Sequence, residues 1–474
     1  MTGGRESARA ERNGRGVPGA VRCGLVEGFY GQPWSHDERL DFLGWGAGAG
    51  FDEYLYAPKD DPFHRERWRE EYPEPDLARI GELARASTAR GVRFTFALHP
   101  ALDMRFADDD EHRALARKAE QAWRVGVRSF SLLFDDVPME LVDPGDRVAF
   151  GDGPEGVGRA HGRTAARFAA NVLRPRGIDA PLLVCPTDYA GNDLTPYRAG
   201  FRAELPAEAV VLWTGRDIVV GEVTRQDVDA AGAAFGRPLV LWDNFPVNDF
   251  DRSRLFLGPL TGRTDDVAGS ALVGIVANPM VEPLPSRFAL ASVGRWAHDP
   301  QGYDRSAAGR DALLRVAGEA AERLAPLVRA CSAWPPSAPR DPELEAWCAL
   351  ALEGDEAARH HAVENFRLLS FVRPAVPPTP LDNALGPWID AAARAGAAGA
   401  LACELLGDHR AGGAAVDEER VSGLQRQLAA VEAATEDVLR PVVASFAHAV
   451  LDRLGADVPP VPTRKPGTSS EPPL

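Results

Sequence analysis

The sequence predicts an α/β fold, a (β/α)8 barrel followed by an α-helical bundle domain. Eight short apolar runs alternate with helix-like segments between residues 21 and 278. The runs are apolar on both faces, which is typical of parallel strands covered by helices. Eight such units in about 280 residues fit a closed barrel. After residue 304 the sequence changes to Ala, Leu, Glu and Arg at helical spacing, broken by Pro-rich stretches, which predicts a helical bundle.

The predicted strands are short and rich in aliphatic residues. They span residues 21–27, 52–58, 92–99, 128–136, 181–187, 209–215, 238–244 and 271–278. Most of them precede a helical pattern, and the first helix starts with Ser35 and Glu38 in the spacing of a capping box. Pro283 and Pro285 follow the eighth strand. We expect them to delay the last barrel helix, because proline is poorly tolerated inside a helix.

The chain divides into four predicted segments. They are a disordered leader (1–20), the barrel (21–304), the helical bundle domain (305–455) and a disordered tail (456–474). The leader is rich in Gly and Arg and lacks the apolar stretch of a secretory signal. No apolar run reaches the roughly 18 residues that a membrane span needs. We therefore expect a cytoplasmic protein without a membrane partner.

Composition limits the kinds of partner and cofactor. The chain has 474 residues, of which 45% are hydrophobic and 26% charged, and its formal net charge is −16. An acidic chain is a poor match for phosphate backbones, so we expect no nucleic-acid partner. The five cysteines are scattered without CxxC spacing, which argues against a disulfide framework or a zinc site. We expect no metal, and a ligand that is neutral or weakly charged.

Polar side chains collect where the predicted strands end, which is where a barrel enzyme places its active site. The fourth strand runs into the adjacent carboxylates Asp135 and Asp136, and Lys59 follows the second. Taken singly, a carboxylate can cap a helix, an aromatic ring can fill a core and a cysteine can be a small buried hydrophobe. Because all these residues are predicted to lie at the same end of the barrel, a binding site is favoured. The other polar or aromatic residues at these ends include Tyr30, Cys185, Tyr189, Trp242, Asn244 and Asn278.

This mixture suits a sugar, because sugar rings pack on aromatic faces while carboxylates, amides and lysine bond to hydroxyl groups. Most glycosidases hold two carboxyl groups about 5 to 9.5 Å apart, on opposite sides of the bond to be cleaved. Neighbours in sequence can hardly straddle a sugar in that way. One Asp would then supply the proton, while the other orients a 2-acetamido group of the substrate as the nucleophile. Because adjacent carboxylates resist joint ionisation, we expect the pair to titrate in two coupled steps, with one proton retained nearer neutrality.

Seven segments in the same order resemble a known family. They are EGFYGQPW (27–34), YAPKDDP (56–62), LLFDDVP (132–138), CPTDY (185–189), LWTG (212–215), LWDNFPVND (241–249) and NPM (278–280). Together they resemble the β-N-acetylglucosaminidases of glycoside hydrolase family 84, the O-GlcNAcase family. The resemblance covers roughly residues 21–300. It is looser across the helical region, although family members commonly carry a helical domain there.

The resemblance implies retaining hydrolysis through an oxazoline intermediate, without a cofactor. Asp135 would accept the acetamido N–H, and Asp136 would be the general acid and then the general base. The residues implied to contact sugar hydroxyls are Gly28, Lys59, Asp249 and Asn278. Those implied to shape the acetamido pocket are Tyr30, Trp242 and Cys185. Those implied to bond the developing ring or the acetamide oxygen are Tyr189 and Asn244.

The leading hypothesis is therefore an exo-acting β-N-acetylglucosaminidase for GlcNAc-containing glycosides or glycoproteins. The alternatives are hyaluronidase-type endo cleavage, a catalytically inactive GlcNAc-binding protein, and a metal-dependent barrel hydrolase. For the last of these, His99 is the one candidate ligand at a strand end. The aglycone stays open among a protein Ser or Thr, a cell-wall fragment and a chitin-derived sugar. The helical domain is expected to form part of the substrate groove, to mediate a homodimer, or to shield the barrel.

Overall fold

The computed structural model describes residues 19–374, 377–410 and 417–456. The predicted leader (1–20) and tail (456–474) lie outside the described residues, apart from residues 19, 20 and 456. Among the helices in the described ranges, none is both long enough and apolar enough to cross a membrane.

The described chain forms two compact units. The first contains the residues up to 249 together with 260–283 and 290–308, and the second contains 250–259, 284–289 and the residues from 309 onward.

The first unit is built on a closed barrel of eight parallel strands in chain order, which confirms the predicted fold class. The first strand pairs with both the second and the eighth, so the sheet has no free edge. Each strand lies within the run predicted for it and is no longer than that run. The strands are β1 (Arg22–Glu27), β2 (Glu53–Tyr56), β3 (Arg93–Leu98), β4 (Ser129–Leu133), β5 (Leu183–Cys185), β6 (Val210–Trp213), β7 (Leu239–Asp243) and β8 (Leu272–Ala277).

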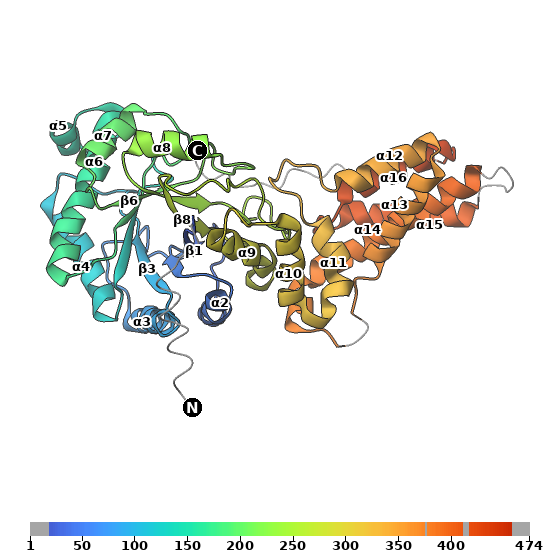
Figure 1. The fold of residues 1–474 in the computed structure, drawn as a ribbon, viewed down its shortest axis with the longest axis horizontal. Coiled ribbons are helices and arrows are strands. Elements are labelled where there is room, and N and C mark those ends of the chain that lie inside the picture. The colour runs from blue at the N-terminus through green and yellow to red at the C-terminus, as the bar shows by residue number, and fades with distance from the viewer. Residues whose placement is uncertain (1–18, 375–376, 411–416, 457–474) are drawn as a thin grey trace. The chain divides into compact units, whose positions relative to one another are not determined.

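Helices surround this barrel in Figure 1, coloured from blue at α2 to olive at α9. They are α2 (His36–Gly48), α3 (Glu74–Ala89), α4 (Asp109–Arg124), α5 (Pro144–Phe150), α6 (Gly153–Phe168), α7 (Pro196–Glu204), α8 (Arg225–Phe235) and α9 (Pro283–His298). A π-helical turn (Ala169–Leu173) and a 3-10 turn (Arg174–Arg176) extend α6. The barrel is filled by small and branched side chains, so it is a packed core and not a channel.

The predicted start of α2 is confirmed, whereas the predicted delay of α9 is wrong. Ser35 accepts from the backbone N–H of Glu38, and the Glu38 carboxylate accepts from the backbone N–H of Ser35, so the capping box is complete. Helix α9 begins at Pro283 itself. The backbone nitrogens of the first helical turn have no partner inside the helix, so Pro283 and Pro285 fit there without loss of a hydrogen bond.

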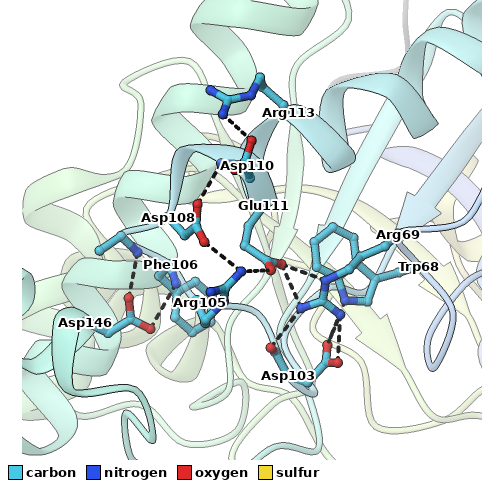
Figure 2. Close-up of polar contacts among 11 residues, drawn as sticks. Trp68, Arg69, Asp103, Arg105, Phe106, Asp108, Asp110, Glu111, Arg113 and Asp146 are labelled. Atoms are coloured by element: carbon cyan, nitrogen blue, oxygen red, sulfur yellow. Dashed lines mark hydrogen bonds and ion pairs between the residues drawn. The ribbon is translucent and has the colours of Figure 1, made fainter.

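Ion pairs join the loops that follow β2 and β3 on the side where the strands end (Figure 2). Arg69 contacts Asp103 at 2.7 Å and Glu111 at 2.9 Å, and the buried Trp68 donates its indole N–H to Asp103 at 2.9 Å. The Asp146 carboxylate accepts from backbone N–H groups of the loop after β3. These contacts fix the loop after β2, which also carries Lys59.

The second unit is helical, and its helices α12 to α16 lie side by side in the orange part of Figure 1. Its helices are α10 (Arg305–Ala317, whose first turn belongs to the first unit), α11 (Ala321–Ala330), α12 (Pro342–Glu353), α13 (Glu356–Ser370), α14 (Pro380–Arg410), α15 (Glu418–Ala433) and α16 (Arg440–Arg453). Gly396 and Gly399 of α14 face α13 so closely that a Cβ on either would lie about 2.5 Å or less from its atoms.

Glycines also let α6 and α7 approach closely in the first unit. A Cβ on Gly158 of α6 would lie 2.1 Å from the carbonyl oxygen of Tyr197, and a Cβ on Gly200 of α7 would lie 2.2 Å from the carbonyl oxygen of Glu155. The obstacles are backbone atoms, which cannot turn away as a flexible side chain could. The absence of a side chain at these positions therefore sets the spacing of the two helices.

We predict that Gly158→Ala lowers the free energy of unfolding by about 1–3 kcal/mol or more, because overpacking forces the helices apart. Denaturant unfolding followed by circular dichroism would measure the change. Gly44→Ala is the matched control, since Gly44 lies in α2 with no neighbouring atom within 4 Å of the place that a Cβ would take. There the expected change is a gain of roughly 0.5–1 kcal/mol. Equal effects at both positions would contradict this account of the packing.

Three buried histidines stay neutral in the first unit. His64, His99 and His161 are at most 1% exposed. Burial lowers the pKa of His99 to about 4 and that of His161 to about 3, and it also lowers the pKa of His64 well below its usual range. In the unfolded chain a histidine takes up its proton near pH 6.5. The unfolded state therefore binds more protons than the folded state over the interval between about pH 6.5 and 4.

We predict that the free energy of unfolding falls by about 2 kcal/mol per buried histidine between pH 7 and pH 5. The sign follows because a histidine with a lowered pKa stabilises the fold above pH 6.5 and loses that contribution as the pH falls. Urea titrations at both pH values would measure this fall in the free energy of unfolding. In His161→Phe the fall should be smaller by the contribution of one histidine, about 2 kcal/mol. His409→Asn, on an exposed histidine, should leave the pH dependence unchanged. An unchanged slope in His161→Phe would contradict the prediction.

Candidate active site

The adjacent carboxylates share a buried lysine. The Nζ atom of Lys59 forms an ion pair with Oδ2 of Asp135 and lies 3.5 Å from Oδ2 of Asp136. The side chains of Lys59 and Asp135 are 2% and 6% exposed, whereas that of Asp136 is 27% exposed. One cation therefore lies against two carboxylates, and only the second carboxylate reaches solvent to a substantial degree.

The lysine changes the expected electrostatics of the pair. Burial by itself would raise the pKa of Asp135, but the ammonium group of Lys59 reverses this and holds that pKa well below its usual range. Burial would likewise lower the pKa of Lys59, and the two carboxylates raise it instead. Asp135 is therefore an anion at neutral pH. Its second oxygen, Oδ1, is buried and has no hydrogen-bond partner within the described part of the chain.

Two tyrosines hold the carboxylate of Asp136. The hydroxyl of Tyr30 donates to Oδ2 at 2.6 Å, and the hydroxyl of Tyr189 donates to Oδ1 at 2.9 Å. Burial raises the pKa of Tyr30 to about 12, and burial and Asp136 raise that of Tyr189 further, so both hydroxyls keep their protons. Asp136 has a φ of 55°, a left-handed conformation that non-glycine residues rarely adopt. The backbone has therefore left the extended conformation of β4 at the second carboxylate.

Tyr30 is itself held from two other directions. Its backbone N–H donates to the carboxylate of Asp249 at 2.8 Å, which ties the loop after β1 to the loop after β7. The guanidinium of Arg65 donates to its hydroxyl at 3.5 Å and lies 5.8 Å from the centre of its ring. The ammonium of Lys59 lies 5.4 Å from the same ring. The tyrosine thus contacts two cations with its ring and donates its hydroxyl proton to Asp136.

A second group of predicted residues forms an amide network beside the carboxylates. The Gly28 N–H donates to Asn278 Oδ1 at 3.3 Å, and Asn278 Nδ2 donates to Asn244 Oδ1 at 3.0 Å. The indole N–H of Trp242 donates to the same Asn244 oxygen at 3.1 Å, and Asn244 Nδ2 donates to the carbonyl of Ile218 at 2.9 Å. This chain of bonds fixes the orientation of both amide groups.

Gly28 is a position where a side chain cannot fit. A Cβ there would lie 2.4 Å from the ring of Trp242. Trp242 and Cys185 form part of the barrel core, and Tyr189 packs against that core. The thiol of Cys185 is buried, which raises its pKa well above the usual value and keeps it protonated. These three side chains therefore connect the predicted site to the barrel core.

The eleven residues predicted for the site therefore lie in two connected sets. The first surrounds the carboxylates and contains Tyr30, Lys59, Asp135, Asp136, Tyr189 and Asp249. The second contains Gly28, Trp242, Asn244 and Asn278, and Cys185 joins it through the barrel core. The contact of Lys59 with the carboxylates is an addition, since the sequence indicated only a sugar contact for it.

Other polar or aromatic residues at the strand ends have structural partners. Asp188 pairs with Arg198 at 3.2 Å, and the fully buried Trp213 donates to the carbonyl of Gly191. His99, considered above as a metal ligand, directs Nε2 at the carbonyl of Asp135, 2.8 Å away. Across the described ranges, no three His, Cys, Asp or Glu side chains gather in a way that could hold a metal ion.

Arg65 and Thr187 contact the site but were not predicted. Arg65 lies six positions after Lys59 in the same loop, and a second cation in a loop already assigned to the site was the available signal. Thr187 lies inside the CPTDY segment, and its hydroxyl donates to the carbonyl of Phe134 at 2.6 Å. No pattern in the sequence distinguishes it from a threonine in an ordinary turn.

Comparison with known proteins indicates the family of the chain. The family model described as beta-N-acetylglucosaminidase matches residues 23–329. The Protein O-GlcNAcase of Rattus norvegicus is 32% identical over 292 residues, and that of Mus musculus is 32% identical over 290 residues. These matches cover 60% and 59% of this chain but only 31% of each relative. The chain therefore spans about a third of the length of these curated relatives.

Solved structures are similar over most of the chain. The structure of CpGH84B matches with a TM-score of 0.82 and 26% identity, covering 91% of this chain and 77% of the other. A mutant of the Thermobaculum terrenum O-GlcNAc hydrolase matches with a TM-score of 0.80 and 25% identity, covering 91% of this chain and 95% of the other. Since the family model covers more than half of the sequence, the chain belongs to the β-N-acetylglucosaminidases of glycoside hydrolase family 84.

Proposed function

We propose that this chain is a retaining exo-β-N-acetylglucosaminidase that removes terminal β-linked GlcNAc through an oxazoline intermediate. The observation that carries the proposal is the unequal state of two neighbouring carboxylates. Asp135 is buried and ionised against Lys59, while Asp136 is partly exposed and held by two tyrosines. Such a difference in environment is how enzymes assign different tasks to two similar acids.

Asp135 suits the task of orienting the acetamido group. Its Oδ1 is a buried acceptor without a hydrogen-bond partner among the described residues, so it can accept the acetamido N–H. As that N–H becomes more acidic during attack, a fixed negative charge beside it stabilises the developing positive charge. Lys59 keeps Asp135 ionised and in place. The lysine then acts on the substrate through the carboxylate, in addition to any contact with a sugar hydroxyl.

Asp136 suits proton transfer in both steps. In the first step the acetamido oxygen bonds to the anomeric carbon, the glycosidic bond breaks, and Asp136 gives its proton to the departing oxygen. In the second step the Asp136 carboxylate takes a proton from water, whose oxygen bonds to the anomeric carbon and reopens the oxazoline. Two inversions give retention. Tyr30 and Tyr189 stabilise the carboxylate that exists between the steps.

The remaining predicted residues suit recognition of the sugar. Gly28 lies against the ring of Trp242 and donates its N–H to Asn278, and Asp249 accepts from the backbone N–H of Tyr30. Trp242 and Cys185 are apolar surfaces on which the acetamido methyl can pack. Asn244 offers polar atoms already oriented by its neighbours. We propose that these groups bind a single terminal sugar, on a GlcNAc-modified protein or on a small glycoside.

We predict that Asp136→Asn lowers kcat/KM for GlcNAc glycosides with poor leaving groups by about 10²–10⁴-fold, because proton donation is lost. Glycosides with activated aryl leaving groups should lose much less, since they need little protonation. Asp135→Asn should lower the rate by about 10²-fold or more for both kinds of substrate, because attack by the acetamido group is impaired. Steady-state kinetics over a series of aryl β-GlcNAc substrates would measure both effects.

Asp265→Ala is the control for these variants, because Asp265 is an exposed aspartate between β7 and β8. It should keep wild-type kinetics. Near-normal rates in Asp135→Asn and Asp136→Asn, with an active wild-type protein, would rule out the assigned roles. Tight binding of an oxazoline mimic without hydrolysis by the wild type would instead indicate an inactive binding protein.

We also predict that cleavage requires the acetamido group. Replacing it by a hydroxyl, as in the corresponding β-glucoside, should abolish measurable turnover because no nucleophile remains. Fluorination of the acetyl methyl should lower kcat/KM progressively, because electron withdrawal weakens the carbonyl oxygen as a nucleophile. Colorimetric assays with matched aryl glycosides would measure the trend.

The product pattern on a β-linked GlcNAc oligomer distinguishes exo from endo cleavage. An exo enzyme releases monosaccharide first, whereas an endo enzyme releases shorter oligomers. Equal turnover of the glucoside would contradict substrate-assisted catalysis. Initial release of oligomers would retain the mechanism but replace the exo assignment.

A further inference from the structure

The two peptide carbonyls before Asp136 are each bound by a side chain from another element. The hydroxyl of Thr187, after β5, donates to the carbonyl of Phe134 at 2.6 Å. The Nε2 atom of His99, after β3, lies 2.8 Å from the carbonyl of Asp135. Both contacts lie where β4 has ended at Leu133, so they take over from strand pairing at the start of the catalytic segment.

Thr187 replaces a bond that the sheet would otherwise make. The N–H of Phe134 donates to the carbonyl of Cys185 at 2.9 Å, as in a parallel ladder. The next bond of such a ladder would run from the N–H of Thr187 to the carbonyl of Phe134. That N–H instead donates to the hydroxyl of Tyr197 at 3.0 Å, and the Thr187 hydroxyl takes its place. The chain can therefore leave the barrel without losing the partner of Phe134.

Two residues of helices α6 and α7, His161 and Tyr197, hold Thr187 in place. The hydroxyl of Tyr197 lies 2.9 Å from Nδ1 of His161, and both residues are 1% exposed. Because Tyr197 already accepts from the N–H of Thr187, its own proton is free to be donated to His161. The ring of His161 also stacks on that of Phe134, with centroids 4.4 Å apart. His161 thus stacks on Phe134 and, through Tyr197, supports Thr187, so it contributes to both partners of the Thr187–Phe134 hydrogen bond.

His99 binds the second of the two carbonyls, that of Asp135, as Thr187 binds the first. It is fully buried and neutral, since burial lowers its pKa to about 4. A carbonyl can only accept, so the single ring proton lies on Nε2. His99 therefore holds the backbone of Asp135, while Lys59 holds its carboxylate.

These contacts bear on the unusual conformation of Asp136. A non-glycine residue with a φ of 55° is retained only where its surroundings fix it. The two carbonyls immediately before it are fixed by Thr187 and His99, and its carboxylate is fixed by Tyr30 and Tyr189. Loss of one carbonyl contact would let the peptide before Asp136 rotate and move the acid away from the leaving oxygen.

We propose that Thr187 and His99 are positioning residues that fix the backbone of the catalytic pair, acting through the carbonyls of Phe134 and Asp135. The proposal rests on the proposed function of Asp135 and Asp136. Neither residue takes part in proton transfer to the substrate. Their loss should therefore alter kcat more than KM, and most for substrates that need acid catalysis.

The test compares Thr187→Val with Thr187→Ser. Valine keeps the shape of the side chain but removes the hydroxyl. We expect kcat for a substrate with a poor leaving group to fall by about 10- to 100-fold, because a displacement of about 1 Å can lower a rate by about that factor. KM should stay within about threefold of the wild-type value. Serine keeps the hydroxyl and should retain kcat within about threefold. A merely structural role would lower the unfolding midpoint of both variants without changing the leaving-group dependence.

Thr164→Val is the matched control, because Thr164 is buried and its hydroxyl donates to the carbonyl of Ala160 within α6. It should keep wild-type kcat. His99→Leu should behave like Thr187→Val, and His99→Gln, which keeps an N–H donor, should recover activity in part. If Thr187→Val does not fold, kcat of Thr187→Ser, His99→Leu and His99→Gln tests the proposal instead.

The outcomes separate the two proposals. An inactive wild type would overturn the proposed function. With an active wild type, wild-type kcat in Thr187→Val, or equal loss in Thr187→Ser, would overturn the positioning role of Thr187. Equal loss in His99→Gln and His99→Leu would overturn that of His99.

Discussion

The contact of one buried lysine with two adjacent carboxylates is the constraint on which the site depends. Lys59 and Asp135 are nearly inaccessible to solvent, and an ionised group in such a place is stable only beside its opposite charge. Removing either partner of a buried pair costs about 3–5 kcal/mol, because the other charge is left without compensation. The neighbouring His64 and His99 are neutral because burial disfavours their charged forms, and the positive charge of Lys59 lowers their pKa further.

The barrel brings these groups together because its strands end at or before the polar residues of the site. All eight strands are parallel, so their carboxyl ends form one rim, and each strand ends at or before the polar residues that follow it. The side chains of the site consequently come from loops that are tied to one another. Tyr30 joins the loop after β1 to the loop after β7, and Arg69 joins the loops after β2 and β3. The loops after β1 and β7, and those after β2 and β3, are therefore bonded in pairs.

Sequence alone predicted the barrel because periodicity and burial are local properties of each segment. The misplaced start of α9 came from treating Pro283 as a helix breaker, although the first turn of a helix needs no N–H from it. The electrostatics were only half predicted. Repulsion between Asp135 and Asp136 was visible as adjacency, but the lysine that offsets it lies 76 positions before Asp135. The contacts of His99 and Thr187 with backbone carbonyls were beyond prediction, since no residue pattern encodes a partner that is a peptide group.

Those contacts connect the outer helices to the chemistry. Gly158 and Gly200 let α6 and α7 approach until backbone nearly meets backbone, and this spacing brings His161 and Tyr197 within hydrogen-bond distance. The hydroxyl of Tyr197 then accepts from the N–H of Thr187, which leaves the carbonyl of Phe134 to accept from the threonine hydroxyl. A helix spacing set by the absence of two side chains is thus transmitted through His161, Tyr197 and Thr187 to Phe134, the residue before the catalytic pair. Because interiors are close-packed, a shift of either helix cannot be absorbed along the way and reaches the carbonyl of Phe134.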